Sequence, residues 1–186
     1  LFLKQQDLRA IKLNLMLFED GVEILKSLGT NILPNIQPRV LKEIGINFTP
    51  SCTLGNSIKD LLRSLSFFRE TLEIVSFKIT SVSIRHCLAD EPLDLPNLLD
   101  FTFEADCGQD MDDKDDTHSF VISSLQSMKR LKNLKILLFN YDFAEKSAKD
   151  MFAVVENIST LQQLSWVLSP EKFNHQGEVV NMDYIN

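Results

Sequence analysis

The chain has 186 residues, of which 44% are hydrophobic and 24% charged, and its formal net charge is −7. This length favours one domain, and the composition excludes collagen-like and wholly disordered chains. No run approaches the roughly 20 apolar residues that a membrane-spanning helix needs, so we expect no membrane partner. The acidic balance and the lack of a clustered basic face argue against nucleic acid, whose binding needs basic residues to displace counterions.

A leucine-led pattern recurs six times along the chain: leucine, two residues, an apolar residue, and two further apolar residues at alternate positions. The six sets are Leu8, Ile11, Leu13, Leu15; Leu41, Ile44, Ile46, Phe48; Leu72, Val75, Phe77, Ile79; Leu98, Phe101, Phe103, Ala105; Leu134, Leu137, Phe139, Tyr141; and Leu161, Leu164, Trp166, Leu168. The leading leucines are separated by 33, 31, 26, 36 and 27 residues. The alternation predicts six strands, each with one buried face.

Apolar residues at helical spacing lie between these strands and predict helices. The sets are Val22, Leu25, Leu28; Ile58, Leu61, Leu62, Leu65; Phe120, Val121, Leu125, Met128; and Ala148, Met151, Phe152, Val155. Candidate N-caps are Asn56, Thr117 and Ser147. The segment around Ile84 and Leu88 has room for a single turn only. All six prolines lie outside the predicted strands, as expected because proline removes a ladder hydrogen bond.

Two architectures alternate strands and helices in this way. A doubly wound sheet has helices on both faces and needs continuously apolar strands. A solenoid has helices on one side, so its strands alternate apolar with polar residues, and polar residues such as Lys12, Asn14, Ser76, Lys78 and Glu104 stand at the alternate positions here. A glycine-rich phosphate-binding turn is also missing. The pattern therefore favours the solenoid.

The units resemble leucine-rich repeats of the long, helix-containing kind and are similar to the ribonuclease-inhibitor-like family over about residues 8–168. The resemblance implies an α/β leucine-rich repeat solenoid of about six repeats in a single domain over residues 1–186, with a curved parallel sheet on the concave side and helices on the convex side. The family's usual Asn or Cys, eight residues after the leading leucine, is replaced by Met16, Thr49, Thr80, Asp106, Asp142 and Ser169. These side chains form either a degenerate polar ladder or part of the solvent-facing surface. Residues 169–186 are expected to form a tail or to begin a further repeat, and the domain is expected to be a fragment of a longer chain.

Candidate chemistry is sparse. The three cysteines, Cys52, Cys87 and Cys107, are far apart and odd in number, which predicts ordinary thiols in a reducing compartment rather than a disulfide framework or zinc site. The histidines lie in separate units, and catalytic motifs are missing. We therefore expect no enzyme activity, metal or cofactor. Without a recognisable signal peptide we expect a cytoplasmic protein, with the nucleus or an organelle as alternatives.

The acidic segment 106–116 is the strongest local anomaly and falls in the longest spacing, so we expect a loop inserted after the fourth strand. Its aspartates are Asp106, Asp110, Asp112, Asp113, Asp115 and Asp116, and with Lys114 they account for −5 of the net charge. Three interpretations stay open: a solvated loop, a contact for a basic partner, or a calcium site. The EF-hand order fails, because Lys114 occupies the fifth position counted from Asp110.

The concave face is the expected binding surface, since solenoids commonly bind there. The predicted contacts are Lys12, Asn14, Asn47, Lys78, Asp100, Glu104, Asp106 and Asn140, and the region around the fourth and fifth units is expected to be the most negative. We predict a non-catalytic protein-interaction or scaffold module, or a subunit of a larger assembly, whose partner is a protein with a basic patch. The alternatives are a GTPase-activating module that uses Arg39, Arg69 or Arg130, and an architectural spacer. Phe48, Phe77, Phe101, Phe103, Phe139 and Trp166 are expected in the core.

Overall fold

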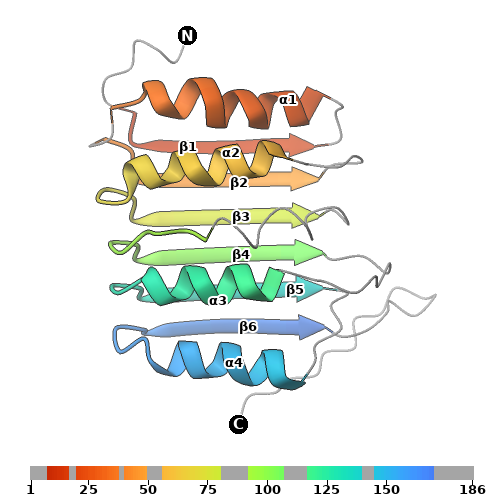
Figure 1. Cartoon of the computed structure of the whole chain (residues 1–186), viewed down its shortest axis with the longest axis vertical. Helices are drawn as coiled ribbons and strands as arrows, with labels where there is room; N and C mark the ends of the chain where they lie inside the picture. The colour runs from red at the N-terminus through yellow and green to blue at the C-terminus, as the bar shows by residue number, and fades with distance from the viewer. Residues whose placement is uncertain are drawn as a thin grey trace, which may run out of the picture.

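The computed structural model describes residues 8–16, 20–37, 40–49, 56–80, 92–106, 117–139 and 145–169. Within these residues a six-stranded sheet is wholly parallel, and its strands follow each other in chain order (Figure 1). The strands are β1 (Ala10–Met16), β2 (Glu43–Thr49), β3 (Ile74–Thr80), β4 (Asp100–Asp106), β5 (Asn133–Phe139) and β6 (Gln163–Ser169). The prolines in the described residues lie outside these strands, as predicted.

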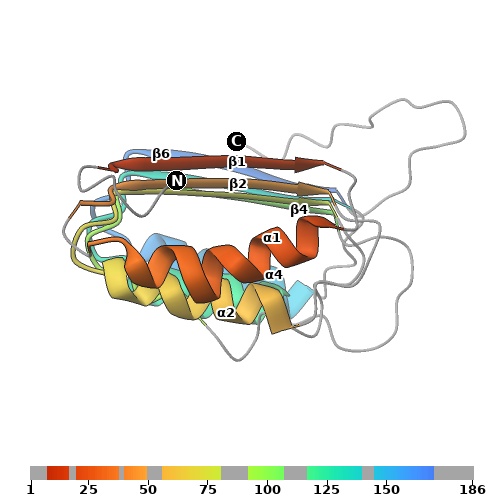
Figure 2. The same cartoon turned by 90° about the horizontal axis from the view of Figure 1, so that it is seen from above.

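The helices all lie on one face of this sheet (Figure 2). They are α1 (Asp20–Ser27), α2 (Asn56–Leu65), α3 (Thr117–Ser127) and α4 (Glu145–Glu156). Short turns extend two of them: the π-helix η2 (Leu28–Ile32) and the 3-10 helix η3 (Leu33–Asn35) follow α1, and the 3-10 helix η4 (Ser66–Phe68) follows α2. The edge strands β1 and β6 lie farther from the helices than β4 does, so the uncovered face is gently concave (Figure 2).

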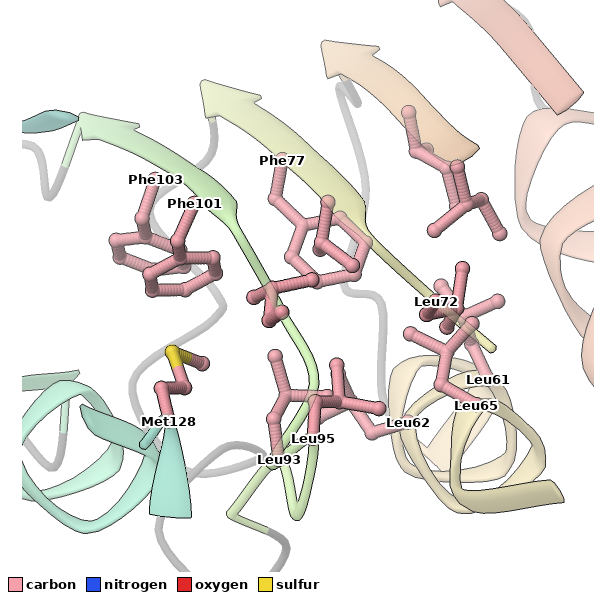
Figure 3. Packing of buried hydrophobic residues seen from close by; sticks show 14 of the residues in the cluster. Leu61, Leu62, Leu65, Leu72, Phe77, Leu93, Leu95, Phe101, Phe103 and Met128 are labelled. Carbon is pink, nitrogen blue, oxygen red and sulfur yellow. The ribbon is translucent and has the colours of Figure 1, made fainter. Parts of the chain in front are cut away.

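The core lies between the sheet and the helices and is built from the predicted alternate positions. Register places Ile46, Phe77, Phe103 and Ile136 side by side on neighbouring strands, and all four are buried. The ring of Phe103 lies 6.3 Å from that of Phe101 and 5.6 Å from that of Phe120 on α3. In Figure 3 the phenylalanines of β3 and β4 point toward the leucines that the helices and connections supply. Large aromatic side chains therefore join the middle strands to the helix layer.

A backbone pattern repeats at the start of every strand after the first. The carbonyl oxygen of Arg9 accepts hydrogen bonds from the N–H groups of both Lys42 and Glu43, at 2.8 and 3.0 Å. Four further carbonyls accept two N–H groups from the next strand's entry in the same way, those of Lys42, Glu73, Leu99 and Lys132. Each of these five residues directly follows a leucine, so the leucine positions and the backbone ladder share one period.

The shared period corrects the register predicted for the fifth leucine-led set. The predicted leading leucine was Leu134, but the ladder and the strand bounds give this place to Leu131, which is fully buried. Leu134, Ile136 and Leu138 then face the core, whereas the prediction turned Leu138 outward and Leu137 and Phe139 inward. The corrected spacings are 33, 31, 26, 33 and 30 residues. The spacing that contains the acidic segment is then 33 residues, the same as the first spacing, so the spacing no longer argues for an insertion there.

The shortest spacing, 26 residues, has a structural cause. The described part of the chain between β3 and β4, residues 92–99, is an irregular segment with one turn rather than a helix. Its Leu93 and Leu95 are buried against the core. Two serines of α3 bind its backbone: Leu93 N donates to Ser124 Oγ at 3.0 Å, Ser127 Oγ donates to Leu93 O at 2.7 Å, and Leu95 N donates to Ser127 Oγ at 3.2 Å. Side-chain hydroxyls thus hold a segment that has no helical hydrogen bonds of its own.

The predicted helices are confirmed at their buried positions, with two corrections on α4. Phe152 was predicted on the apolar face of this helix but is 47% exposed, and its ring stacks on that of the half-buried Trp166 at the edge of the sheet, with ring centroids 5.1 Å apart. Ser147 was expected as an N-cap but lies inside α4, which begins at Glu145. The predicted turn around Ile84 and Leu88 lies outside the described residues.

Candidate functional site

The candidate site is the face of the sheet that no described helix covers, here called the open face (Figure 2). Its side chains alternate with those of the core, and the parallel register sorts them into rows across the strands. The first row is Ala10, Glu43, Ile74, Asp100, Asn133 and Gln163; the second is Lys12, Gly45, Ser76, Thr102, Lys135 and Ser165; the third is Asn14, Asn47, Lys78, Glu104, Leu137 and Val167. Of the fourth row, which includes Asp106, only the backbone is described.

The third row brings together four of the predicted contacts. Asn14, Asn47, Lys78 and Glu104 stand directly opposite one another on β1 to β4. Neighbouring strands are about 4.8 Å apart, so these four side chains form one continuous polar strip across the sheet. Lys12 lies in the second row and Asp100 in the first, so the structure gathers six of the eight predicted contacts on one surface. Asn140 and the aspartates at 110–116 lie outside the described residues.

Charges on the open face are paired across strands. Lys12 Nζ lies 2.7 Å from Glu43 Oε1, and Lys78 Nζ lies 2.5 Å from Glu104 Oε1. Asn133 Nδ2 donates a hydrogen bond to Asp100 Oδ1. Exposed ion pairs of this kind contribute about 0–1 kcal/mol each, so they orient the side chains more than they stabilise the fold.

On the described rows, β4 and β5 carry two carboxylates and one lysine, whereas β1 to β3 carry two lysines and one carboxylate. Glu104 is neutralised by Lys78, Asp100 is hydrogen bonded to Asn133, and the exposed Lys135 stands one row away. Three lysines and three carboxylates balance across the three rows. The aspartates at 110–116, which were predicted to add to the negative charge of this region, lie outside the described residues.

Beside the polar strip, the open face is lowered at Gly45 in the second row. Gly45 carries no side chain, and a Cβ added there would meet only Lys12 Cγ, at 3.7 Å. Asn47, two residues further along β2, has a buried side-chain oxygen with no hydrogen-bond partner in the described structure.

Several open-face residues were missed from the sequence. Glu43 occupies the same position after its leading leucine as Asp100 does, and this equivalence was the available signal. Asn133 and Lys135 were missed because the fifth strand was assigned the wrong register. Ser76 and Thr102 have short side chains, so they project less from the middle of the second row than the lysines of that row can.

The described residues do not bring together a catalytic or metal-binding arrangement. They include no cluster of three or more His, Cys, Asp or Glu side chains that could hold a metal ion. Among the arginines considered for a GTPase-activating role, Arg69 is engaged by Glu70 at 3.4 Å and Asp94 at 3.1 Å, Arg130 is exposed, and Arg39 lies outside the described residues.

Comparison of the chain with protein-family models and with curated proteins gives no match. Among the described residues, none of the helices combines the length and apolar character needed to cross a lipid bilayer.

Proposed function

We propose that this chain is a non-catalytic leucine-rich repeat module that binds another protein through the open face of its sheet. The observation that carries the proposal is the asymmetry of the sheet: one face is buried under helices, and the other is polar and is covered by none of the described helices. A parallel sheet with helices on only one face is unusual, because all-parallel sheets are normally covered on both faces. A partner is the natural second layer.

The repeat character is supported by the period that leucines and backbone share. Leu41, Leu72, Leu98 and Leu131 are fully buried at equivalent positions, and each is followed by a carbonyl that accepts two N–H groups. Units that stack in this way bury one continuous core and leave an extended surface along the strands. An extended surface of this kind suits a scaffold or a subunit of a larger assembly.

The size of the open face is suitable for protein binding. Six strands spaced by about 4.8 Å and seven residues rising by about 3.3 Å each define a sheet of roughly 24 by 23 Å, or about 550 Å² in projection. A standard interface buries about 800 Å² on each partner, so the sheet face supplies most of one partner's share. Its balanced charges favour a partner surface that carries both signs beside hydrogen-bond donors. A basic patch on the partner, placed against residues 107–116, stays a prediction.

A steric block tests the proposal. Thr102→Arg places a long side chain in the low middle row without changing the core, so the fold is retained and binding is lost. The measurement is affinity capture with the wild-type chain, identification of a partner that co-purifies in fixed stoichiometry, and reconstitution of that complex from purified proteins. We expect Thr102→Arg to weaken the reconstituted complex by about tenfold or more.

The matched control is Gln126→Arg, which adds the same side chain to the exposed surface of α3 on the helix side. This variant should bind the partner as the wild type does. Equal binding by both variants would show that the open face is not the interaction surface and would favour the architectural spacer. Loss of binding by Gln126→Arg alone would move the site to the helix side.

A further inference from the structure

Among the described strands, β6 lies at an edge of the sheet and exposes a core-facing apolar side chain whose counterpart on β5 is buried. Leu164 on β6 is 43% exposed, whereas Leu134, its partner in register on β5, is 2% exposed. Phe152 on α4 and Val167 on β6 are also exposed, and Phe152 stacks on Trp166 at an interplanar angle of 17°. We call Phe152, Leu164, Trp166 and Val167 the β6 patch. It joins the helix layer to the free edge of the sheet.

The free edge itself lacks the usual protection against pairing. Natural edge strands are guarded by charged residues, proline or bulges, because their unpaired N–H and C=O groups form a template for another strand. β6 reads Gln-Leu-Ser-Trp-Val-Leu-Ser and contains neither a charge nor a proline. The opposite edge differs: β1 carries Lys12, and its core-facing Ile11 is buried.

We propose that the β6 patch is a self-association surface, and that its occupant is the β6 patch of a second copy of this chain. A two-fold axis places each residue of the patch near its own counterpart, so a charged strand would meet its own charge. β6 carries no charged residue, so no like charges face each other across the axis. The exposed apolar residues of one copy contact those of the other. Stacking onto β1 of another copy is less favourable, because β1 presents a lysine and a covered core residue.

The two β6 strands would run antiparallel, since a two-fold axis perpendicular to a sheet reverses the strand direction. A register with Trp166 on the axis keeps the core-facing residues of both strands on the helix side. The two sheets then join into one, and the two Phe152 side chains approach each other beneath it. Val167 is the one patch residue that also belongs to the open face. Because joining the two sheets edge to edge leaves that face uncovered, this proposal is independent of the proposed binding function.

Sedimentation velocity and light scattering of the purified chain over a wide range of concentration test the proposal. We expect a reversible, concentration-dependent change from monomer to dimer and no larger species. Leu164→Lys should raise the dimer dissociation constant by about tenfold or more, because the introduced charge occurs on both sides of the axis. Since Leu164 is already 43% exposed, this variant should keep its far-ultraviolet circular dichroism and melting temperature.

Ile24→Lys is the matched control, because Ile24 is also 43% exposed but belongs to α1 in the first unit. It should dimerise as the wild type does. A chain that is monomeric at every concentration would overturn the proposal and would leave the chain's own segment after β6 or a different protein as the occupant. A dimer that survives Leu164→Lys would also overturn it. Open-ended oligomers that are disrupted by Ile24→Lys would establish head-to-tail stacking instead.

Discussion

At the scale of single residues, Gly29 shows how closely the first two units pack. A Cβ at this position would lie 2.7 Å from Leu61 N and 2.8 Å from Asp60 C, both backbone atoms of α2. Ser64 on α2 reinforces the approach, since its hydroxyl donates to the carbonyl oxygen of Gly29 and also lies 2.9 Å from that of Asp60. A methyl group can be accommodated here only if two helical segments move apart.

Gly29→Ala should therefore lower the free energy of unfolding by about 1–3 kcal/mol, the usual cost of forcing an extra methyl group into a packed interior. Gly45→Ala is the control, because the added Cβ on the open face would make only an ordinary contact. That variant should be neutral or slightly stabilising, because glycine weakens a strand. Urea unfolding of both variants makes the comparison, and equal effects would contradict the close approach at Gly29.

At the scale of elements, the segment 92–99 depends on α3 for the backbone hydrogen bonds of Leu93 and Leu95. Replacing both Ser124 and Ser127 by Ala leaves the buried N–H of Leu93 without an acceptor, at a cost of about 1–3 kcal/mol for each unsatisfied group. We expect a matching loss in the free energy of unfolding and faster amide hydrogen exchange at Leu93 and Leu95. Ser123→Ala, on the same helix, should change neither. Unchanged exchange in the double variant would show that apolar packing alone holds the segment.

The elements also show what could be predicted from the sequence. Five strands and the buried faces of the helices were predictable, because alternation and helical spacing report directly on burial. The fifth strand was not, because Leu131 and Leu134 both precede apolar residues at the required spacing. The backbone ladder decides between them, because the carbonyl that accepts two N–H groups belongs to Lys132, which directly follows Leu131. The open-face contacts on β1 to β4 followed from alternation, whereas the pairing of Lys78 with Glu104 required the register between strands.

At the scale of the whole molecule, each described strand pairs only with the strands that precede and follow it in the chain, so stability should vary across the sheet. The middle strands β3 and β4 carry Phe77, Phe101 and Phe103, all buried, and have a paired strand on each side. β6 has one neighbour, and its core-facing Leu164 is largely open to solvent. Local opening should therefore require the least free energy at β6.

Amide hydrogen exchange on the Leu164→Lys variant measures this gradient in a chain that cannot use β6 for self-association. We expect the slowest exchange in β3 and β4 and the fastest in β6, since opening β6 exposes little additional apolar surface. β1 should be better protected than β6, because Ile11 and Leu25 are buried at that end. Equal protection in all six strands would instead mean that the sheet opens only in one global step. In the wild-type chain, exchange from β6 should become slower as the protein concentration rises, because the second copy covers this strand in the dimer.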